Sequence, residues 1–450
     1  MLERLLLRYL RNWVIGRVLT IILVALLFSG CTTNPATGRL QFSIVGTETE
    51  RKIGHDVFLY LDSEAIDSGP FIKDGPYVKY LEHVVSRMYP FFNRKDFTPI
   101  RVVLSPSAEP NAWALPGYLS VNIGLLQCLE NESQLAFVIA HEMGHIDSRH
   151  TAEKYSQMIL ANLVVTSANI YAGQLGGLIG SLGSALVLSA YSRSQEYEAD
   201  KLGFYYATQA GYSKDEIVKT MSVVESCGKD YMSYLGVKRD EFGGFLNRLF
   251  SDHPLTKERV KRLSYYSDGV KSVGYVYSKD FDSVKRWAKE RNTVLREIDK
   301  ALYIASSTKD PYKGLSVLSP LEATISSSNI EPEIKAKYYV VKAYLLFNEK
   351  MYREAQKSAL IALDYVNHYL VAAKIAGLSG LRAKGNEDIV LSKGAFERCL
   401  SYKPNDPLCL KGALIASCTL KDKSCSSYCR QYLKVSPSDY PSVSSYCVSR

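Results

Sequence analysis

The sequence lacks a basic stripe with interleaved aromatic residues, the usual footprint of a nucleic-acid-binding protein. Its 450 residues carry a formal net charge of +9. Part of that excess lies in the first seventeen residues, where four arginines face only Glu3, and the rest is spread along the chain. We therefore expect no nucleic-acid partner. A mild positive bias instead suits work near an anionic membrane surface.

Charge is also missing from the whole stretch between Lys154 and Arg193. A membrane span is not expected there, because the stretch contains asparagine, glutamine and five glycines between Gly173 and Gly183. It is also too short for two spans and a turn, at about 20 residues per span. We expect a buried helix pair or a mobile flap.

The N-terminus has the three-part layout of a secretory signal. A basic stretch precedes the apolar run Val18 to Phe28, and Ser29-Gly30-Cys31 follows. This ending resembles a bacterial lipobox, which predicts a lipoprotein signal peptide over residues 1–30 and lipidation of Cys31. Thr32 stands where aspartate would signal retention in the inner membrane, so we expect a periplasmic protein anchored to the outer membrane. The alternative is an uncleaved signal anchor.

Cysteine usage fits an exported protein. Of nine cysteines, Cys31 would carry lipid, Cys128 and Cys227 are scattered, and six crowd the last 52 residues. In an oxidising compartment some of these six could pair. The alternative is that they fill small-residue positions in packed helices, as Cys399 does in the repeat pattern described below.

The stretch "VIAHEMGHIDSRH" places three histidines and two acids on an otherwise apolar helix pattern. His141, Glu142 and His145 spell H-E-x-x-H, which puts both imidazoles on one face of a helix, one turn apart. Glu142 points about 100° away, where it can hold a water rather than bind the ion. Zn²⁺ suits such a site, with one position left open. His150 falls off this face, and we interpret it as structural.

A second element, "SRSQEYEAD", supplies carboxylates. Glu196 and Asp200 lie one helical turn apart, so Glu196 could be the third ligand while Asp200 accepts a hydrogen bond from a ligand histidine. Glu198 competes for the ligand role, but it lies about 200° around the helix from Glu196. The partner at Asp200 favours Glu196.

Several segments occur in an order that resembles the M48 family of zinc metallopeptidases, and in particular its bacterial periplasmic quality-control branch. They are "NPATGRLQFSIV", "NAWALPGYLSVNIGLL", "ENESQLAFVIAHEMGH", "YSRSQEYEAD" and "DHPLTKERVKRL". The resemblance implies one Zn²⁺ per chain held by His141, His145 and Glu196, with Glu142 as catalytic base assisted by Asp200. It also implies cleavage of misfolded or stalled outer-membrane proteins.

The C-terminal part has helical patterns with a period near 34. "GAFERCLSYKP" ends at Pro404 and "SSYCRQYLKVSP" ends at Pro437, 33 residues later. The period, the spaced small residues and the closing proline resemble tetratricopeptide repeats. Such repeats are expected to bind substrate or the outer-membrane protein assembly machinery.

The expected fold is mainly α (α+β): a zincin-like metallopeptidase domain with a small β-sheet, followed by helical repeats. The expected boundaries are 31–270 for the peptidase domain, 271–300 for a helical linker and 301–450 for the repeats. The expected function is that of a membrane-tethered zinc metalloendopeptidase acting on unfolded proteins. The alternatives are a chaperone-like adaptor with a structural zinc site, or another zinc-dependent hydrolase such as an amidase.

Two further hypotheses concern control and docking. His253 precedes Pro254, which should keep it in a loop, and there it could act as a regulatory fourth metal ligand. The "NAWALPGYLSVN" segment predicts two strands around a Pro-Gly turn. An edge strand there could pair with an extended substrate, and we expect a proline at Ser120 to reduce cleavage if that edge is used.

Overall fold

The computed structural model describes residues 31–166, 191–237, 257–270, 274 and 278–447. The predicted signal peptide, most of the charge-free stretch and the proposed regulatory residue His253 lie outside the described residues. Among the helices that are described, none combines the length and the apolar composition needed to cross a bilayer.

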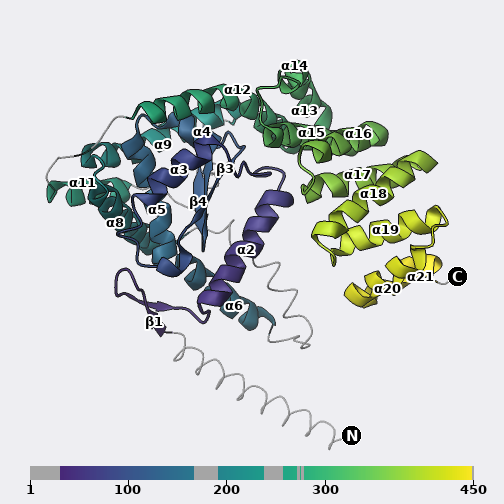
Figure 1. The fold of residues 1–450 in the computed structure, drawn as a ribbon, viewed down its shortest axis with the longest axis horizontal. Coiled ribbons are helices and arrows are strands. Elements are labelled where there is room, and N and C mark those ends of the chain that lie inside the picture. Colours follow the sequence, from purple (N-terminus) through teal and green to yellow (C-terminus); the bar gives the residue numbers. More distant parts are fainter. Residues whose placement is uncertain (1–30, 167–190, 238–256, 271–273, 275–277, 448–450) are drawn as a thin grey trace, which may run out of the picture.

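The N-terminal part mixes short strands with helices (Figure 1). Its elements are β1 (Cys31–Thr33), β2 (Leu40–Phe42), α2 (Thr47–Ser63), α3 (Pro76–Ser86), the 3-10 turn η1 (Lys95–Phe97), β3 (Arg101–Ser105), β4 (Ala112–Leu115), β5 (Tyr118–Asn122), α4 (Ile123–Cys128), α5 (Glu132–Asp147), α6 (His150–Thr166), α8 (Arg193–Gln209), α9 (Lys214–Leu235) and α11 (Lys257–Asp268).

The larger of two small sheets has the strand order β3-β5-β4. β5 is parallel to β3 and antiparallel to β4. The β4–β5 hairpin turns at Pro116-Gly117, where Gly117 has a φ of +88°, a left-handed conformation that glycine adopts without strain. Ser120 pairs with both neighbours, so it lies on the central strand and a proline there would break the sheet itself. Within this hairpin the edge strand is β4 (the other edge of the sheet is β3), and the choice of Ser120 as a test of edge pairing was wrong.

Helix α5 is the centre of this part, and all of its residues except Val138 are buried. Asn131 caps its N-terminus by accepting from the Gln134 N–H (3.1 Å), and α8 packs along its length. The two helices approach closely because Gly203 has no side chain. A Cβ at that position would lie 2.8 Å from the backbone nitrogen of His141.

The C-terminal part is entirely helical in the residues described: α12 (Lys279–Thr308), α13 (Pro311–Leu318), η2 (Ser319–Leu321), α14 (Glu322–Ile325), α15 (Pro332–Asn348), α16 (Tyr352–Tyr365), α17 (Leu370–Ala383), α18 (Asn386–Tyr402), α19 (Pro407–Thr419), α20 (Cys425–Val435), η3 (Pro437–Asp439) and α21 (Tyr440–Cys447). From α15 to α20, each helix packs on the next in chain order. The mainly helical fold with a small sheet is confirmed.

One apolar core contains residues from Ile72 to Leu345, so α12 packs as a single helix against the peptidase part.

Eight cysteines form four disulfides. Cys128 pairs with Cys227, which ties the end of α4 to α9. The six C-terminal cysteines pair as Cys399–Cys409, Cys418–Cys425 and Cys429–Cys447. The expectation that some of the six pair is therefore confirmed. Cys399 occupies a buried helix position, as the repeat pattern predicted, but it is bonded rather than a mere packing residue.

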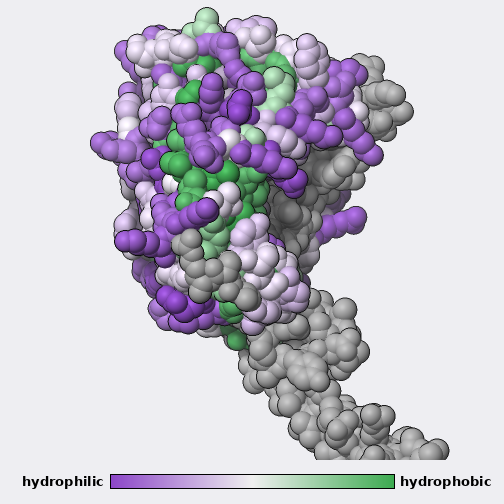
Figure 2. All heavy atoms as spheres, turned by 90° about the vertical axis from the view of Figure 1, so that its right-hand side faces the viewer, coloured by the Kyte–Doolittle hydropathy of each residue, from purple (hydrophilic) through white to green (hydrophobic). Residues whose placement is uncertain are grey.

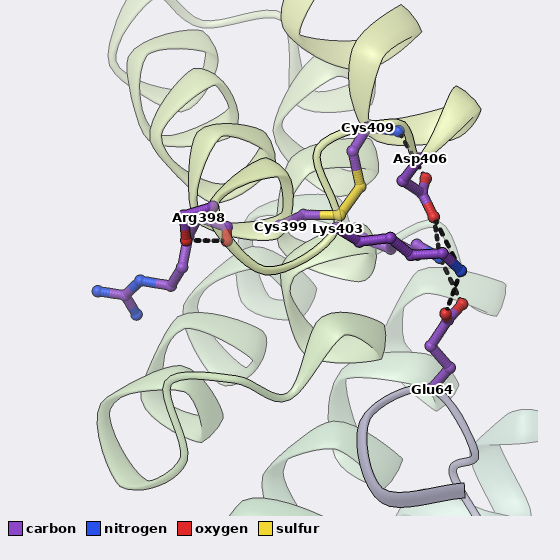
Figure 3. The surroundings of a disulfide bond; sticks show 8 residues. Glu64, Arg398, Cys399, Lys403, Asp406 and Cys409 are labelled. Atoms are coloured by element: carbon purple, nitrogen blue, oxygen red, sulfur yellow. Dashed lines mark hydrogen bonds and ion pairs between the residues drawn. A yellow bond between two sulfur atoms is a disulfide. The ribbon is translucent and has the colours of Figure 1, made fainter. Parts of the chain in front are cut away.

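The repeats touch the peptidase part through a group of ion pairs, from partly buried to exposed, beside the Cys399–Cys409 disulfide (Figure 3). Glu64, at the end of α2, accepts from Lys374 and Lys403, at 2.6 Å each. Lys374 also pairs with Asp406 (2.9 Å), whose carboxylate caps α19 by accepting from the Cys409 N–H. The disulfide thus fixes the loop whose charges face Glu64.

Candidate metal centre and active site

Helices α5 and α8 bring three potential metal ligands together. Single ligand atoms of His141, His145 and Glu196 all lie within 4.8 Å of one another, and all three residues are buried. The two Nε2 atoms are 3.1 Å apart, and the Glu196 carboxylate oxygens lie 3.6 Å and 3.5 Å from them. Two imidazoles and one carboxylate are a donor set that zinc prefers. The residues present therefore fit a Zn²⁺ ion.

Local sequence explains why these side chains converge. His141 and His145 are one turn apart on α5, whereas α8 starts with a capping box in which Ser192 and Gln195 bond each other's backbone. That cap places Glu196 in the first turn of α8, opposite the histidines. Glu198, the rival ligand, points elsewhere and lies 3.0 Å from His150.

Asp200 lies behind His141, as its spacing from Glu196 suggested. Its Oδ1 is 3.0 Å from the His141 Nδ1, so the ring donates from Nδ1 and presents Nε2 toward Glu196. Burial alone would raise the pKa of Asp200, but the Arg259 charge and the hydrogen bonds from Arg259 and His141 lower it to about 2. Asp200 is therefore an ionised acceptor at any ordinary pH.

Arg259, on α11, is a site residue that the sequence reasoning missed. Its guanidinium donates twice to Asp200, from Nε and Nη2 at 2.7 Å each, and Nη1 lies 2.6 Å from Glu196. Burial would lower the pKa of Arg259, but the two carboxylates hold it above its ordinary value. Its position in the quoted segment "DHPLTKERVKRL" was the signal available, although nothing in the spacing indicated which charge points inward.

His150 was also placed differently from what helix geometry suggested. Helical spacing placed His150 off the face of His141 and His145, on the assumption that one helix continues through residue 150. In the structure α5 ends at Asp147, and Arg149 has a left-handed φ of +56°. The chain therefore turns back, and the His150 Nδ1 lies 2.8 Å from the His145 Nδ1. Complete burial lowers the pKa of His150, more than the nearby Glu198 raises it, so the ring is neutral near pH 7.

Glu142 borders a small cavity next to the ligands. The cavity has a volume of about 60 Å³, and its walls include Phe137 and Val138 of α5, Met221 and Val224 of α9, and Ala112 of the edge strand. A larger cavity, about 510 Å³, lies away from the ligands, between α2 and the repeats. Only the smaller cavity borders Glu142, and a carboxylate can act as a general base only on a group within hydrogen-bond reach.

Comparisons with known proteins agree with this geometry. Residues 78–267 match the family described as peptidase family M48. A protease HtpX homolog of Pelotomaculum thermopropionicum is 28% identical over 57% of this chain and 98% of its own length. The mitochondrial metalloendopeptidase OMA1 of Schizosaccharomyces pombe is 26% identical over 51% of this chain and 64% of its own. A beta-barrel assembly-enhancing protease of Yersinia pestis is 28% identical, over 32% of each chain.

The match covers α3 to α11, and therefore the two helices that carry the ligand set and the helix that carries Arg259. With the sequence resemblance and the convergence of His141, His145 and Glu196, it leads to one conclusion: residues 78–267 form a domain of the peptidase M48 type, and the protein is a metalloprotease.

Proposed function

We propose that this protein is a zinc endopeptidase of the bacterial cell envelope that cleaves unfolded or misfolded proteins, with Glu142 as its general base. The observation that carries the proposal is the buried cluster of His141, His145 and Glu196, with Glu142 on the adjacent cavity. The name of the Yersinia pestis relative supports a role in the envelope.

In this proposal each residue has one task. His141, His145 and Glu196 hold the ion, and a bound Zn²⁺ supplies the Lewis acidity that activates water and polarises a peptide carbonyl. Glu142 accepts the proton of the attacking water and hands it to the leaving amine. Asp200 and Arg259 keep His141 and Glu196 in place through the contacts described above.

The decisive experiment compares wild type with Glu142→Gln on a chemically unfolded outer-membrane protein. Glutamine keeps the size of the side chain but cannot take the proton, so cleavage should fall by at least about 100-fold. Zinc content, expected at one ion per chain, should stay unchanged. Equal cleavage by both proteins would overturn the assignment of Glu142. Zinc binding without any cleavage by wild type would favour the chaperone-like adaptor.

Substrate docking is proposed to use the free edge of β4. The Asn122 N–H donates to the Asn111 carbonyl (3.0 Å), and an antiparallel ladder alternates, so the backbone groups of Ala112 and Ala114 point away from β5. No described strand pairs with that edge. Pairing through the backbone ignores side-chain identity, which suits a protease of unfolded chains.

Ala114→Pro tests this docking without breaking the sheet. It removes one outward N–H on an edge strand, where proline is tolerated, and cleavage should fall about 10-fold, corresponding to one lost hydrogen bond of about 1.4 kcal/mol. An unchanged rate with an intact fold would exclude pairing at this position.

The helical repeats are proposed to hold apolar segments of the substrate. Figure 2 shows a hydrophobic strip between hydrophilic margins on the face at the repeat side of the molecule. Large apolar side chains of these helices are exposed, among them Tyr344, Ile361, Val390, Leu391 and Leu408. Their sequence pattern supports the proposal that they are tetratricopeptide-like repeats. We also propose that they contact the outer-membrane protein assembly machinery.

Lipidation of Cys31 is proposed to anchor the protein at the periplasmic face of the outer membrane. Asn34, three residues later, already contacts the Ser148 carbonyl at the end of α5 (3.2 Å). Three residues span at most about 11 Å, so an anchored protein would hold its site close to the bilayer. Labelled fatty acid should enter wild type but not Cys31→Ser. Absence of label in wild type would favour an uncleaved anchor.

The regulatory role of His253 likewise stays a proposal.

A further inference from the structure

Both histidines of the ligand set have a partner at Nδ1, but the two partners differ. Asp200 contacts His141 directly, whereas His145 contacts His150, a second imidazole that is fully buried. The other nitrogen of His150, Nε2, lies 3.0 Å from the Glu198 carboxylate. The series Glu198–His150–His145 therefore ends, like Asp200–His141, on the side of the ring that faces away from Glu196.

The hydrogen-bond directions along this series follow from donor and acceptor rules. A carboxylate only accepts, so the His150 Nε2 carries the hydrogen that Glu198 receives. If His145 binds an ion through the lone pair of Nε2, its one hydrogen lies on Nδ1, 2.8 Å from the His150 Nδ1. The His145 Nδ1 is then the donor, and the His150 Nδ1 is the acceptor. The series therefore holds His145 in the tautomer that a metal ligand needs.

Glu198 is itself held by a segment that is distant in sequence. Asn34 donates to Glu198 Oε1 (3.0 Å), the Thr37 hydroxyl donates to the same oxygen, and the Arg39 Nε donates to Oε2 (3.0 Å). Arg39 also pairs with Glu153 of α6, at 2.8 Å. The Glu198 side chain is nearly buried, at 9% exposure, so these contacts set its position.

The segment is shaped for this task by its own turn. The Asn34 side chain accepts from the Ala36 N–H (2.9 Å), its backbone carbonyl accepts from the Gly38 N–H (2.9 Å), and Gly38 has a φ of +74°. Asn34 is buried, at 1% exposure. The turn thereby aims Asn34, Thr37 and Arg39 at one carboxylate.

We propose that Asn34, Arg39, Glu198 and His150 are positioning residues for the metal ligand His145, so that the turn next to Cys31 forms part of the metal centre. This inference rests on the proposed function, because it takes His145 to be a zinc ligand. It gives the "NPATGR" segment a defined role that the peptidase chemistry alone did not require.

The test measures zinc affinity by chelator competition in His150→Ala, Glu198→Gln and Arg39→Ala. Support behind a ligand histidine is worth about 10- to 100-fold in affinity. We expect a loss in that range for His150→Ala, and about 10-fold or less for the two more distant changes. Lys201→Ala, an exposed change on the same helix as Glu198, is the matched control and should bind zinc like wild type.

Two further measurements separate positioning from simple stability. The absorption spectrum of the Co²⁺-substituted protein reports ligand geometry, and it should change in His150→Ala and Glu198→Gln. The melting temperature of the metal-free variants reports the fold. A lower melting temperature with unchanged zinc affinity and spectrum would overturn the proposal. If His150→Ala does not fold, Glu198→Gln and Arg39→Ala decide.

The failure of this inference is distinct from the failure of the proposed function. Zinc binding that is equal in wild type and all variants removes the positioning role but leaves the peptidase intact. If wild type binds no zinc, or if Glu142→Gln cleaves the substrate as fast as wild type does, the proposed function fails instead.

Discussion

At the scale of single residues, the site is a balance of buried charge. Glu196 and Asp200 lie on one face of α8, and Arg259 contacts both at 2.6–2.7 Å. All three side chains are at most 2% exposed. Charges buried to this degree are tolerated only when they are paired, so Arg259 allows two carboxylates to lie together next to His141 and His145.

Replacing Arg259 by alanine should therefore destabilise the protein by about 3–5 kcal/mol, the usual cost of removing one partner of a buried pair. Zn²⁺ would neutralise part of the remaining charge on Glu196, so the loss should be smaller with zinc than without it. Thermal unfolding of wild type and variant, each with and without zinc, measures both effects. An equal loss in the two conditions would mean that Glu196 does not face the ion.

At the scale of elements, the crossing of α5 and α8 decides whether the ligands meet. Gly203 lies against the backbone of His141, and Gly144 lies against Ala199, where an added Cβ would be 3.1 Å from the Ala199 carbonyl oxygen. Each helix thus presents a glycine to the other at the crossing. The short separation brings Glu196 within reach of both imidazoles.

Gly203→Ala should separate these helices. The new Cβ would lie 2.8 Å and 2.9 Å from backbone atoms of His141, which cannot move aside cheaply. We expect a stability loss of about 1–3 kcal/mol, as for other overpacked cores, together with weaker zinc binding. Gly394→Ala is the control, because it is also helical but has open space around it. It should be neutral or stabilising by up to about 1 kcal/mol. Unweakened zinc binding in Gly203→Ala would show that the crossing does not set the ligand distance.

At the scale of the whole molecule, charged contacts join the repeats to the peptidase part. Burial would raise the pKa values of Glu64 and Asp406, but bonds from Lys374, and from Lys403 to Glu64, lower both. The ordinary pKa values are 4.5 for Glu64 and 3.8 for Asp406. Because both pKa values are lowered in the folded protein, the contact contributes its full stabilisation when the pH is above these ordinary values. The stabilisation is lost as the pH falls through the lowered values.

Acid should therefore weaken this junction. The urea midpoint of wild type should exceed that of Glu64→Gln by a constant amount from pH 7 to about pH 5, and the difference should shrink below that. Circular dichroism, which is dominated here by helices, follows the transition. Glu354→Gln, an exposed change on α16, should show no such pH-dependent difference. A difference in urea midpoint between wild type and Glu64→Gln that grows as the pH falls would contradict the assigned direction of the pKa shift.

The sequence by itself determined the features that depend on local spacing. The pair of histidines on α5, the pair of acids on α8, the Pro-Gly hairpin and the helical C-terminal part follow from periodicity, capping and turn residues, which act over a few positions. The metal site could be predicted because H-E-x-x-H and E-x-x-x-D each fit within one or two helical turns, whereas the assignment as a metalloprotease came from the resemblance to family M48.

Only the tertiary structure decided which distant residues complete the site. His150 reaches His145 because Arg149 reverses the chain, and no helical periodicity extends across a left-handed residue. Asn34 and Arg39 meet Glu198 across about 160 residues, and Arg259 meets Asp200 across 59. Such contacts depend on how helices and turns pack in space, which the spacing of residues along the chain does not encode.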